Sequence, residues 1–354
     1  MEYGMKYVFL FSGQGAQFKG MLQDVCAEYP KARQTIDKMS DICGEDIASF
    51  LWHTENAELS RSDKSQLAIT ASQIALCEVL KDKGIQPAAA AGFSLGEFAA
   101  LYASGVLSLT DVTKLVCARG KIMQACCDRI ASQTDVGTTG AGKITAGAAG
   151  TTGEAASPNT VSSALAAPGM AAVIKLSPET VVQLLEPYSS EKNGSVFAAN
   201  MNSPVQTVVS GTAEGLAEAE KLCMQAGAKR FIRLAVAGPF HSPLMASAAE
   251  DFAEVLKTVV FANPVIPLFS NVTGDLVKTG EEAKKNAVLH ITHPVRWTQE
   301  EKEIDSYIPA SERTLLEIGP GTTLCNLWRD SGCESVCMPT GTLDHIKTVL
   351  QALH

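Results

Sequence analysis

The sequence predicts an α/β protein with two subdomains, a larger one around a parallel sheet and a smaller one inserted into it. Three observations support this prediction. Short apolar runs lead through glycine turns into helical patterns at three separate places, as parallel strands that alternate with helices do. Residues 170–236 have a different order of elements, βαββαβ. The chain has 354 residues, 46% of them hydrophobic, which is enough to bury a core of this size.

The first strand–turn–helix junction lies near the start of the chain. Residues 7–11 are an apolar, strand-like run, and a loop with Gly13, Gln14 and Gly15 follows before a helix. This loop lacks the glycine spacing and the lysine of a phosphate-binding loop. Two interpretations remain: a tight turn between strand and helix, or a loop whose Gln14 N–H faces a ligand.

The second junction contains a serine held between glycines. Helices are expected over residues 20–85, including a long one at 65–83. A strand is then expected at 87–91, and it leads into the turn Gly92-Phe93-Ser94-Leu95-Gly96. A Gly-x-Ser-x-Gly turn is typical of the nucleophile elbow of α/β-hydrolase-like sheets, where it exposes the serine hydroxyl above the strands. The N–H of Leu95, at the start of the next helix, would lie beside any negative charge formed there.

A charged residue falls on the apolar face of the following helix. The helix is predicted from residue 108 to about 127, and Arg119 has helical spacing from Val112, Leu115 and Val116. A buried guanidinium needs an anionic partner. The pattern leaves two partners open, a structural carboxylate or a substrate carboxylate.

A change of composition marks the boundaries between subdomains. Residues 131–169 are rich in Ala, Gly, Thr and Ser, which predicts a flexible insertion without a catalytic role. Residues 170–236 then form the ferredoxin-like subdomain, with strands expected at 170–176, 196–200, 206–211 and 229–236. The large subdomain would comprise residues 1–130 and 237–354.

The large subdomain resumes at a rigid loop with a histidine. His241 lies between Pro239 and Pro243, which suits a base that must stay within reach of a hydroxyl. Strands are expected at 265–271 and 314–318, and the latter leads through a third glycine turn into a helix from residue 322. The three junctions should meet at the carboxyl ends of parallel strands, where α/β proteins bind ligands.

Composition and charge exclude several functions. The net charge of −9 argues against a nucleic-acid-binding protein, and no apolar run is long enough to span a membrane. The ten cysteines are scattered, so reduced thiols and a reducing compartment are expected. Neither metal-ligand spacing nor a signal peptide is recognisable.

Seven motifs in order give the chain a family resemblance. The sequence resembles malonyl-CoA:acyl carrier protein transacylases over nearly its whole length outside the low-complexity insertion. The motifs are Phe11-Ser-Gly-Gln-Gly-Ala-Gln17, Gly92-Phe-Ser-Leu-Gly-Glu97, Ala118-Arg-Gly-Lys-Ile-Met-Gln124, Asn200-Met-Asn-Ser-Pro204, Phe240-His-Ser242, His293-Pro-Val-Arg-Trp297 and Glu317-Ile-Gly-Pro-Gly321.

The resemblance implies a role for each part of the catalytic machinery. Ser94 would be the acylated nucleophile and His241 its general base and acid. The backbone carbonyl of Arg296 would orient His241, since the family usually lacks a triad carboxylate. The N–H groups of Gln14 and Leu95 would form the oxyanion hole.

The resemblance also implies the substrate contacts. Arg119 would bind the malonyl carboxylate, Phe240 would crowd the acyl α-carbon, and Asn202 would belong to the substrate site. Phe93 departs from the histidine that most of the family has before the nucleophile, and an apolar residue there is similar to plastid-type members. The expected location is therefore the cytoplasm, or the stroma of a plastid or other organelle, with no transit peptide in this chain.

The resulting hypothesis is a monomeric enzyme that moves malonyl from coenzyme A to holo acyl carrier protein by a ping-pong mechanism, for fatty acid synthesis. It would need no metal or cofactor, because the CoA thioester is a substrate. Two alternatives are a serine esterase or thioesterase, which shares the elbow, and a non-catalytic module that only docks the carrier protein.

Overall fold

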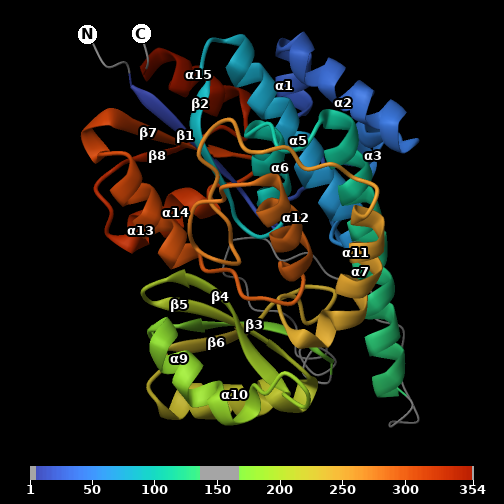
Figure 1. The fold of residues 1–354 in the computed structure, drawn as a ribbon, viewed down its shortest axis with the longest axis vertical. Helices are drawn as coiled ribbons and strands as arrows, with labels where there is room; N and C mark the ends of the chain where they lie inside the picture. The colour runs from blue at the N-terminus through green and yellow to red at the C-terminus, as the bar shows by residue number, and fades with distance from the viewer. Residues whose placement is uncertain (1–4, 136–166, 353–354) are drawn as a thin grey trace.

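The computed structural model describes residues 5–135 and 167–352. It contains two four-stranded sheets, which lie in two units along the longest axis of the molecule (Figure 1). Most helices surround the first sheet, and helix α7 (Leu109–Asp135) extends from that unit toward the second (Figure 1). The predicted α/β class with two subdomains is confirmed.

The first sheet is parallel and brings the three glycine junctions together. Its strands are β1 (Lys6–Phe11), β2 (Pro87–Gly92), β7 (Arg313–Ile318) and β8 (Cys337–Pro339), in the order β2-β1-β7-β8. Phe11 at the end of β1 is in register with both Gly92 and Ile318, at the ends of β2 and β7. The loops that follow the three strands therefore start at one edge of the sheet, as predicted.

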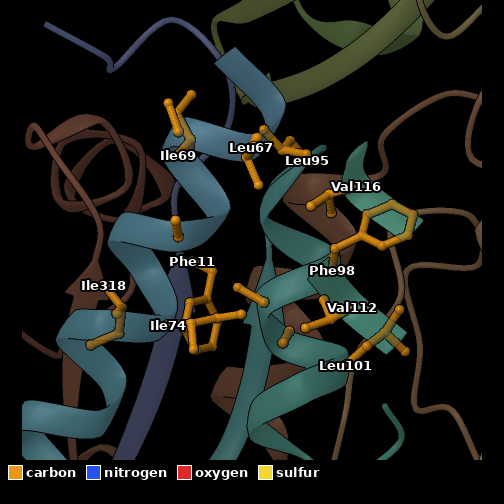
Figure 2. Packing of buried hydrophobic residues seen from close by; sticks show 14 of the residues in the cluster. Phe11, Leu67, Ile69, Ile74, Leu95, Phe98, Leu101, Val112, Val116 and Ile318 are labelled. Atoms are coloured by element: carbon orange, nitrogen blue, oxygen red, sulfur yellow. The ribbon is translucent and has the colours of Figure 1, made fainter. Parts of the chain in front are cut away.

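Helices pack on this sheet and bury its apolar faces. Helix α5 (Ser62–Asp82) is buried along most of its length and not on one face only. Figure 2 shows Ile69 and Ile74 of α5 in the same cluster as Phe11 and Ile318. The remaining helices of this unit are α1 (Gln23–Glu28), α2 (Pro30–Cys43), α3 (Ile47–His53), α4 (Asn56–Leu59), α6 (Gly96–Ala103), α11 (Ala246–Leu256), α12 (Gly280–Leu289), α13 (Trp297–Tyr307), α14 (Thr323–Ser331) and α15 (Leu343–Ala352), with the short helices η2 (Pro243–Met245) and η3 (Ala310–Glu312).

The second sheet is antiparallel and has the predicted ferredoxin-like topology. Its elements follow the chain order β3, α9, β4, β5, α10, β6, and the strand order is β4-β5-β3-β6. Side chains of Ser177 and Thr212 cap α9 and α10, which cover one face of the sheet (Figure 1). The bounds are β3 Gly169–Ile174, α9 Pro178–Leu185, η1 Glu186–Tyr188, β4 Val196–Ser203, β5 Gln206–Gly211, α10 Ala213–Gln225 and β6 Arg230–Arg233.

Backbone hydrogen bonds join the two units. The N–H of Met201 in β4 donates to the Val295 carbonyl at 2.9 Å, and the N–H of Val295 donates to the Ala199 carbonyl at 2.8 Å. The antiparallel sheet is thereby fixed to the segment that precedes α13.

Two parts of the sequence prediction need correction. No strand forms at residues 265–271, because prolines at 264 and 267 lack the N–H that a ladder requires. The segment still lies beside β2. The N–H of Ala90 donates a hydrogen bond to the Pro267 carbonyl, and the N–H of Phe269 donates one to the Ala90 carbonyl. Helix α7 continues to Asp135, into the predicted insertion, of which residues 136–166 lie outside the described residues.

Candidate active site

Ser94 lies in a sharp turn between β2 and α6. Its φ of +51° is in the left-handed region, which is strained for a residue with a side chain. A Cβ atom at Gly92 would lie 2.2 Å from the Gly96 carbonyl carbon, and one at Gly96 would lie 2.1 Å from the Phe11 oxygen. Both glycines are therefore required by close packing, and the turn leaves the Ser94 side chain partly exposed.

The Ser94 hydroxyl is hydrogen-bonded to a histidine from a distant part of the chain. Its Oγ lies 2.8 Å from Nε2 of His241. His241 also has a positive φ, +56°, and its loop is fixed by Ser242, whose hydroxyl donates to the Pro239 carbonyl at 2.6 Å. The residue is 5% exposed. The two side chains have the geometry of a nucleophile and its general base.

A backbone carbonyl orients the His241 ring, but it is not the expected one. Nδ1 of His241 donates to the carbonyl of His290 at 2.9 Å, so Nε2 carries the lone pair that faces Ser94. The prediction of Arg296 is wrong, because its carbonyl accepts the N–H groups of Gln299 and Glu300 at the start of α13. His290 is the C-cap of α12, where carbonyls lack partners within the helix.

Asn271 connects the elbow to the buried residues beneath it. Its Oδ1 accepts the N–H of Ser94 at 2.6 Å, and its Nδ2 donates to the Gly92 carbonyl and to Oε1 of Glu300. Its own N–H donates to Oε2 of Glu97 at 2.9 Å. Asn271 therefore fixes the backbone on both sides of Phe93. The sequence motifs do not include Asn271, although a polar residue that ends an apolar run is a usable signal.

Two backbone N–H groups, one from the first glycine junction and one from the second, are available to bind an anion. In the described part of the chain, neither the N–H of Leu95 nor that of Gln14 has a hydrogen-bond partner. Leu95 directly precedes α6, and Gln14 lies in the loop that follows β1. The end of β1 is joined to the elbow, because the N–H of Phe93 donates to the Phe11 carbonyl at 2.8 Å. Such donors can stabilise an oxyanion.

Arg119 is a buried cation without a carboxylate partner among residues 5–135 and 167–352. Its side chain belongs to α7, the residue is 2% exposed, and its guanidinium carbon lies 5.2 Å from the centre of the Phe98 ring. Nη1 donates to Oε1 of Gln66 at 2.7 Å, and Nη2 lies 3.4 Å from Nδ1 of His290. Nε has no partner in the same range. Since a guanidinium has five N–H bonds, three remain for a ligand.

The surroundings of His241 and Arg119 determine the charge that each side chain carries at pH 7. Burial, and then the positive charge of Arg119, lower the pKa of His241 to about 4, so the ring is neutral at pH 7 and able to accept a proton. Burial lowers the pKa of Arg119 to about 10, opposed by the negative charge of Glu97, so the guanidinium remains charged. The site thus combines a neutral imidazole with a charged guanidinium.

The remaining predicted residues have less direct contacts. Phe240 is buried next to His241, and Asn202 on β4 is 7% exposed, with an Oδ1 that has no partner among the described residues. No described hydrogen bond links Asn202 to Ser94 or His241. The Phe93 ring packs edge-to-face on Trp297 at 5.5 Å, which places it against the core.

Comparisons with known proteins find a family model and similar curated proteins for this chain. A family model described as acyl transferase domain matches residues 8–192. The malonyl CoA-acyl carrier protein transacylase of Bacillus subtilis (strain 168) is 34% identical over 322 residues, which cover 91% of this chain and 89% of that protein.

Two solved structures are similar in fold and sequence. An acyl carrier protein S-malonyltransferase from Vibrio cholerae has a TM-score of 0.80 and 28% identity, covering 97% of this chain and 99% of its own. A malonyl-transacylase in complex with its holo acyl carrier protein of type II polyketide synthesis has a TM-score of 0.81 and 29% identity, covering 98% of this chain and 99% of its own.

In the described residues, no helix is both long and apolar enough to cross a membrane.

Proposed function

Because the chain belongs to the malonyl-CoA:acyl carrier protein transacylase family, we propose that it transfers malonyl from coenzyme A to the thiol of holo acyl carrier protein through an ester on Ser94. The proposed substrates are those in the names of its relatives, and one similar structure contains the carrier protein of a type II polyketide system. We expect the product of this chain to enter fatty acid synthesis. Two observations together carry the proposal. Ser94 is hydrogen-bonded to His241, and the same site contains a buried Arg119 that has no carboxylate partner among the described residues.

The first half-reaction forms the acyl-enzyme. Ser94 Oγ attacks the thioester carbonyl carbon while Nε2 of His241 takes the hydroxyl proton. The N–H groups of Gln14 and Leu95 bind the oxygen of the tetrahedral intermediate. When the carbon–sulfur bond breaks, His241 returns the proton to the sulfur of coenzyme A, and malonyl remains on Ser94.

The second half-reaction reverses these steps with another thiol. The carrier-protein thiol loses its proton to His241 and attacks the Ser94 ester. Collapse of the intermediate breaks the ester bond, and the proton on His241 returns to Ser94. Because Nδ1 of His241 is bonded to the His290 carbonyl, and no carboxylate of the described residues is bonded to it, the proposed machinery is a Ser–His dyad.

Arg119 gives the site its preference for malonyl. A carboxylate can form two parallel hydrogen bonds with the free N–H groups of the guanidinium, and acetyl has no group that can do so. Burial is the main cause of the low pKa of His241 and the charge of Arg119 is the second. A bound carboxylate would offset that charge, which would raise the pKa of His241 in part and make it a stronger base. We further propose that Phe240 and Asn202 shape the substrate site around the acyl group.

The test compares two acceptors for the malonyl group. We expect purified protein with malonyl-CoA to transfer malonyl to holo carrier protein at least about a hundred times faster than to water, because the dyad activates a thiol while the acyl-enzyme resists hydrolysis. Product formation is followed by mass spectrometry, with apo carrier protein, which lacks the thiol, as the control. Equal rates of transfer and hydrolysis would support a thioesterase instead.

A further inference from the structure

The side chain of His290 joins three parts of the site, although the reaction steps use only its backbone carbonyl. The residue is 1% exposed. Its Nε2 lies 3.1 Å from Oδ1 of Asn271, its Nδ1 lies 3.4 Å from Nη2 of Arg119, and its ring centre is 5.0 Å from that of His241. The imidazole therefore lies between the residue that fixes the elbow and the cation that would bind the substrate.

The hydrogen bonds of Asn271 determine which His290 nitrogen carries the proton. Asn271 uses its amide Nδ2 to donate to the Gly92 carbonyl and to Glu300, so its Oδ1 is the acceptor. That oxygen accepts from the Ser94 N–H and from Nε2–H of His290. In a neutral imidazole Nδ1 then carries a lone pair, and this lone pair faces an N–H of Arg119.

The charge state of His290 agrees with this arrangement. Burial, together with the positive charges that His241 and Arg119 can carry, lowers the pKa of His290 well below its usual value. A neutral ring can accept a hydrogen bond from the guanidinium, whereas a protonated ring would repel it. Glu97, whose Oε2 is 3.9 Å from Nε2 of His290, is the nearest acidic group with a recorded contact.

We propose that the imidazole of His290 is a positioning residue that holds the guanidinium of Arg119 in the orientation that binds the malonyl carboxylate. The proposal rests on the proposed function. Gln66 holds Nη1 and His290 holds Nη2, so the two acceptors together fix the plane of the guanidinium. Through Asn271 the same ring is tied to the backbone of Ser94, which sets the distance between nucleophile and carboxylate site.

The experiment removes the ring nitrogens and keeps the backbone carbonyl. In His290→Phe both polar contacts of the imidazole are lost, whereas in His290→Asn the side-chain oxygen can replace Nδ1 as acceptor for Arg119. Malonyl-CoA and acetyl-CoA are compared as donors to holo carrier protein. We expect His290→Phe to lower the malonyl/acetyl ratio of kcat/KM about tenfold, mainly through a higher KM for malonyl-CoA, and His290→Asn to restore most of it.

The outcomes separate a positioning role from a structural one. His53→Phe, on the exposed end of α3, is the matched control and should leave the ratio unchanged. An unchanged ratio in His290→Phe, or equal loss with both donors and no recovery in His290→Asn, would overturn the proposal. If His290→Phe does not fold, a normal ratio in His290→Ala would overturn it in the same way. Failure of the proposed function is distinct, because the wild-type protein would then transfer no malonyl.

Discussion

Replacing Ser94 or His241 with alanine is expected to lower malonyl transfer by about ten-thousand- to a million-fold. Ser94→Ala removes the atom that forms the ester. His241→Ala removes the only side chain among the described residues that is hydrogen-bonded to this hydroxyl, at 2.8 Å, and with it the general base. Stopped-flow or quenched-flow measurement of coenzyme A release in a single turnover reports the loss directly.

The double variant tests whether the two side chains act as one unit. If they do, Ser94→Ala/His241→Ala is no slower than either single variant, because each change alone already stops proton transfer and attack. Losses that multiply in the double variant would show two independent contributions and contradict the dyad. Melting temperatures of all three variants provide the control for correct folding.

Arg119→Ala is expected to lower kcat/KM for malonyl-CoA by about a hundred- to a thousand-fold while acetyl-CoA is affected little or gains. The physical reason is that Arg119 is buried, and its free N–H groups have no carboxylate partner among the described residues. Only the substrate with a carboxylate uses those donors. Parallel assays with the two donors measure the selectivity.

A matched variant and a stability measurement control this result. Arg119→Lys keeps the positive charge but loses the bidentate geometry, so it should recover only part of the malonyl preference. If Arg119→Ala instead fails to fold, or if kcat/KM falls equally for malonyl-CoA and acetyl-CoA, the arginine serves the structure and not the substrate. A matched loss of stability in Gln66→Ala, which removes the acceptor of Nη1, would point the same way.

Local patterns in the sequence were sufficient for much of the fold. The three glycine junctions are recognisable because each joins an apolar run to a helix, and parallel strands bring their ends together. Gly92 and Gly96 predict the turn at Ser94, because no larger residue fits at either position. The βαββαβ order was likewise readable from alternating patterns.

Contacts between distant residues could not be read in the same way. Asn271 holds the N–H of Ser94, which lies 177 positions earlier in the chain, and Gln66 and His290 reach Arg119 from two different helical regions. Such pairings depend on how helices pack, which periodicity does not specify. The family resemblance likewise implies that the Arg296 carbonyl orients His241, whereas the carbonyl of His290, at the end of α12, does so.

The most direct test of the account is the mass of the protein after brief incubation with malonyl-CoA. Acid quenching, protease digestion and mass spectrometry should find one malonyl group on the peptide that contains Ser94, and addition of holo carrier protein before quenching should remove it. Ser94→Ala protein should remain unmodified. An unmodified wild-type Ser94, or malonyl attached to another residue, would contradict the proposed mechanism.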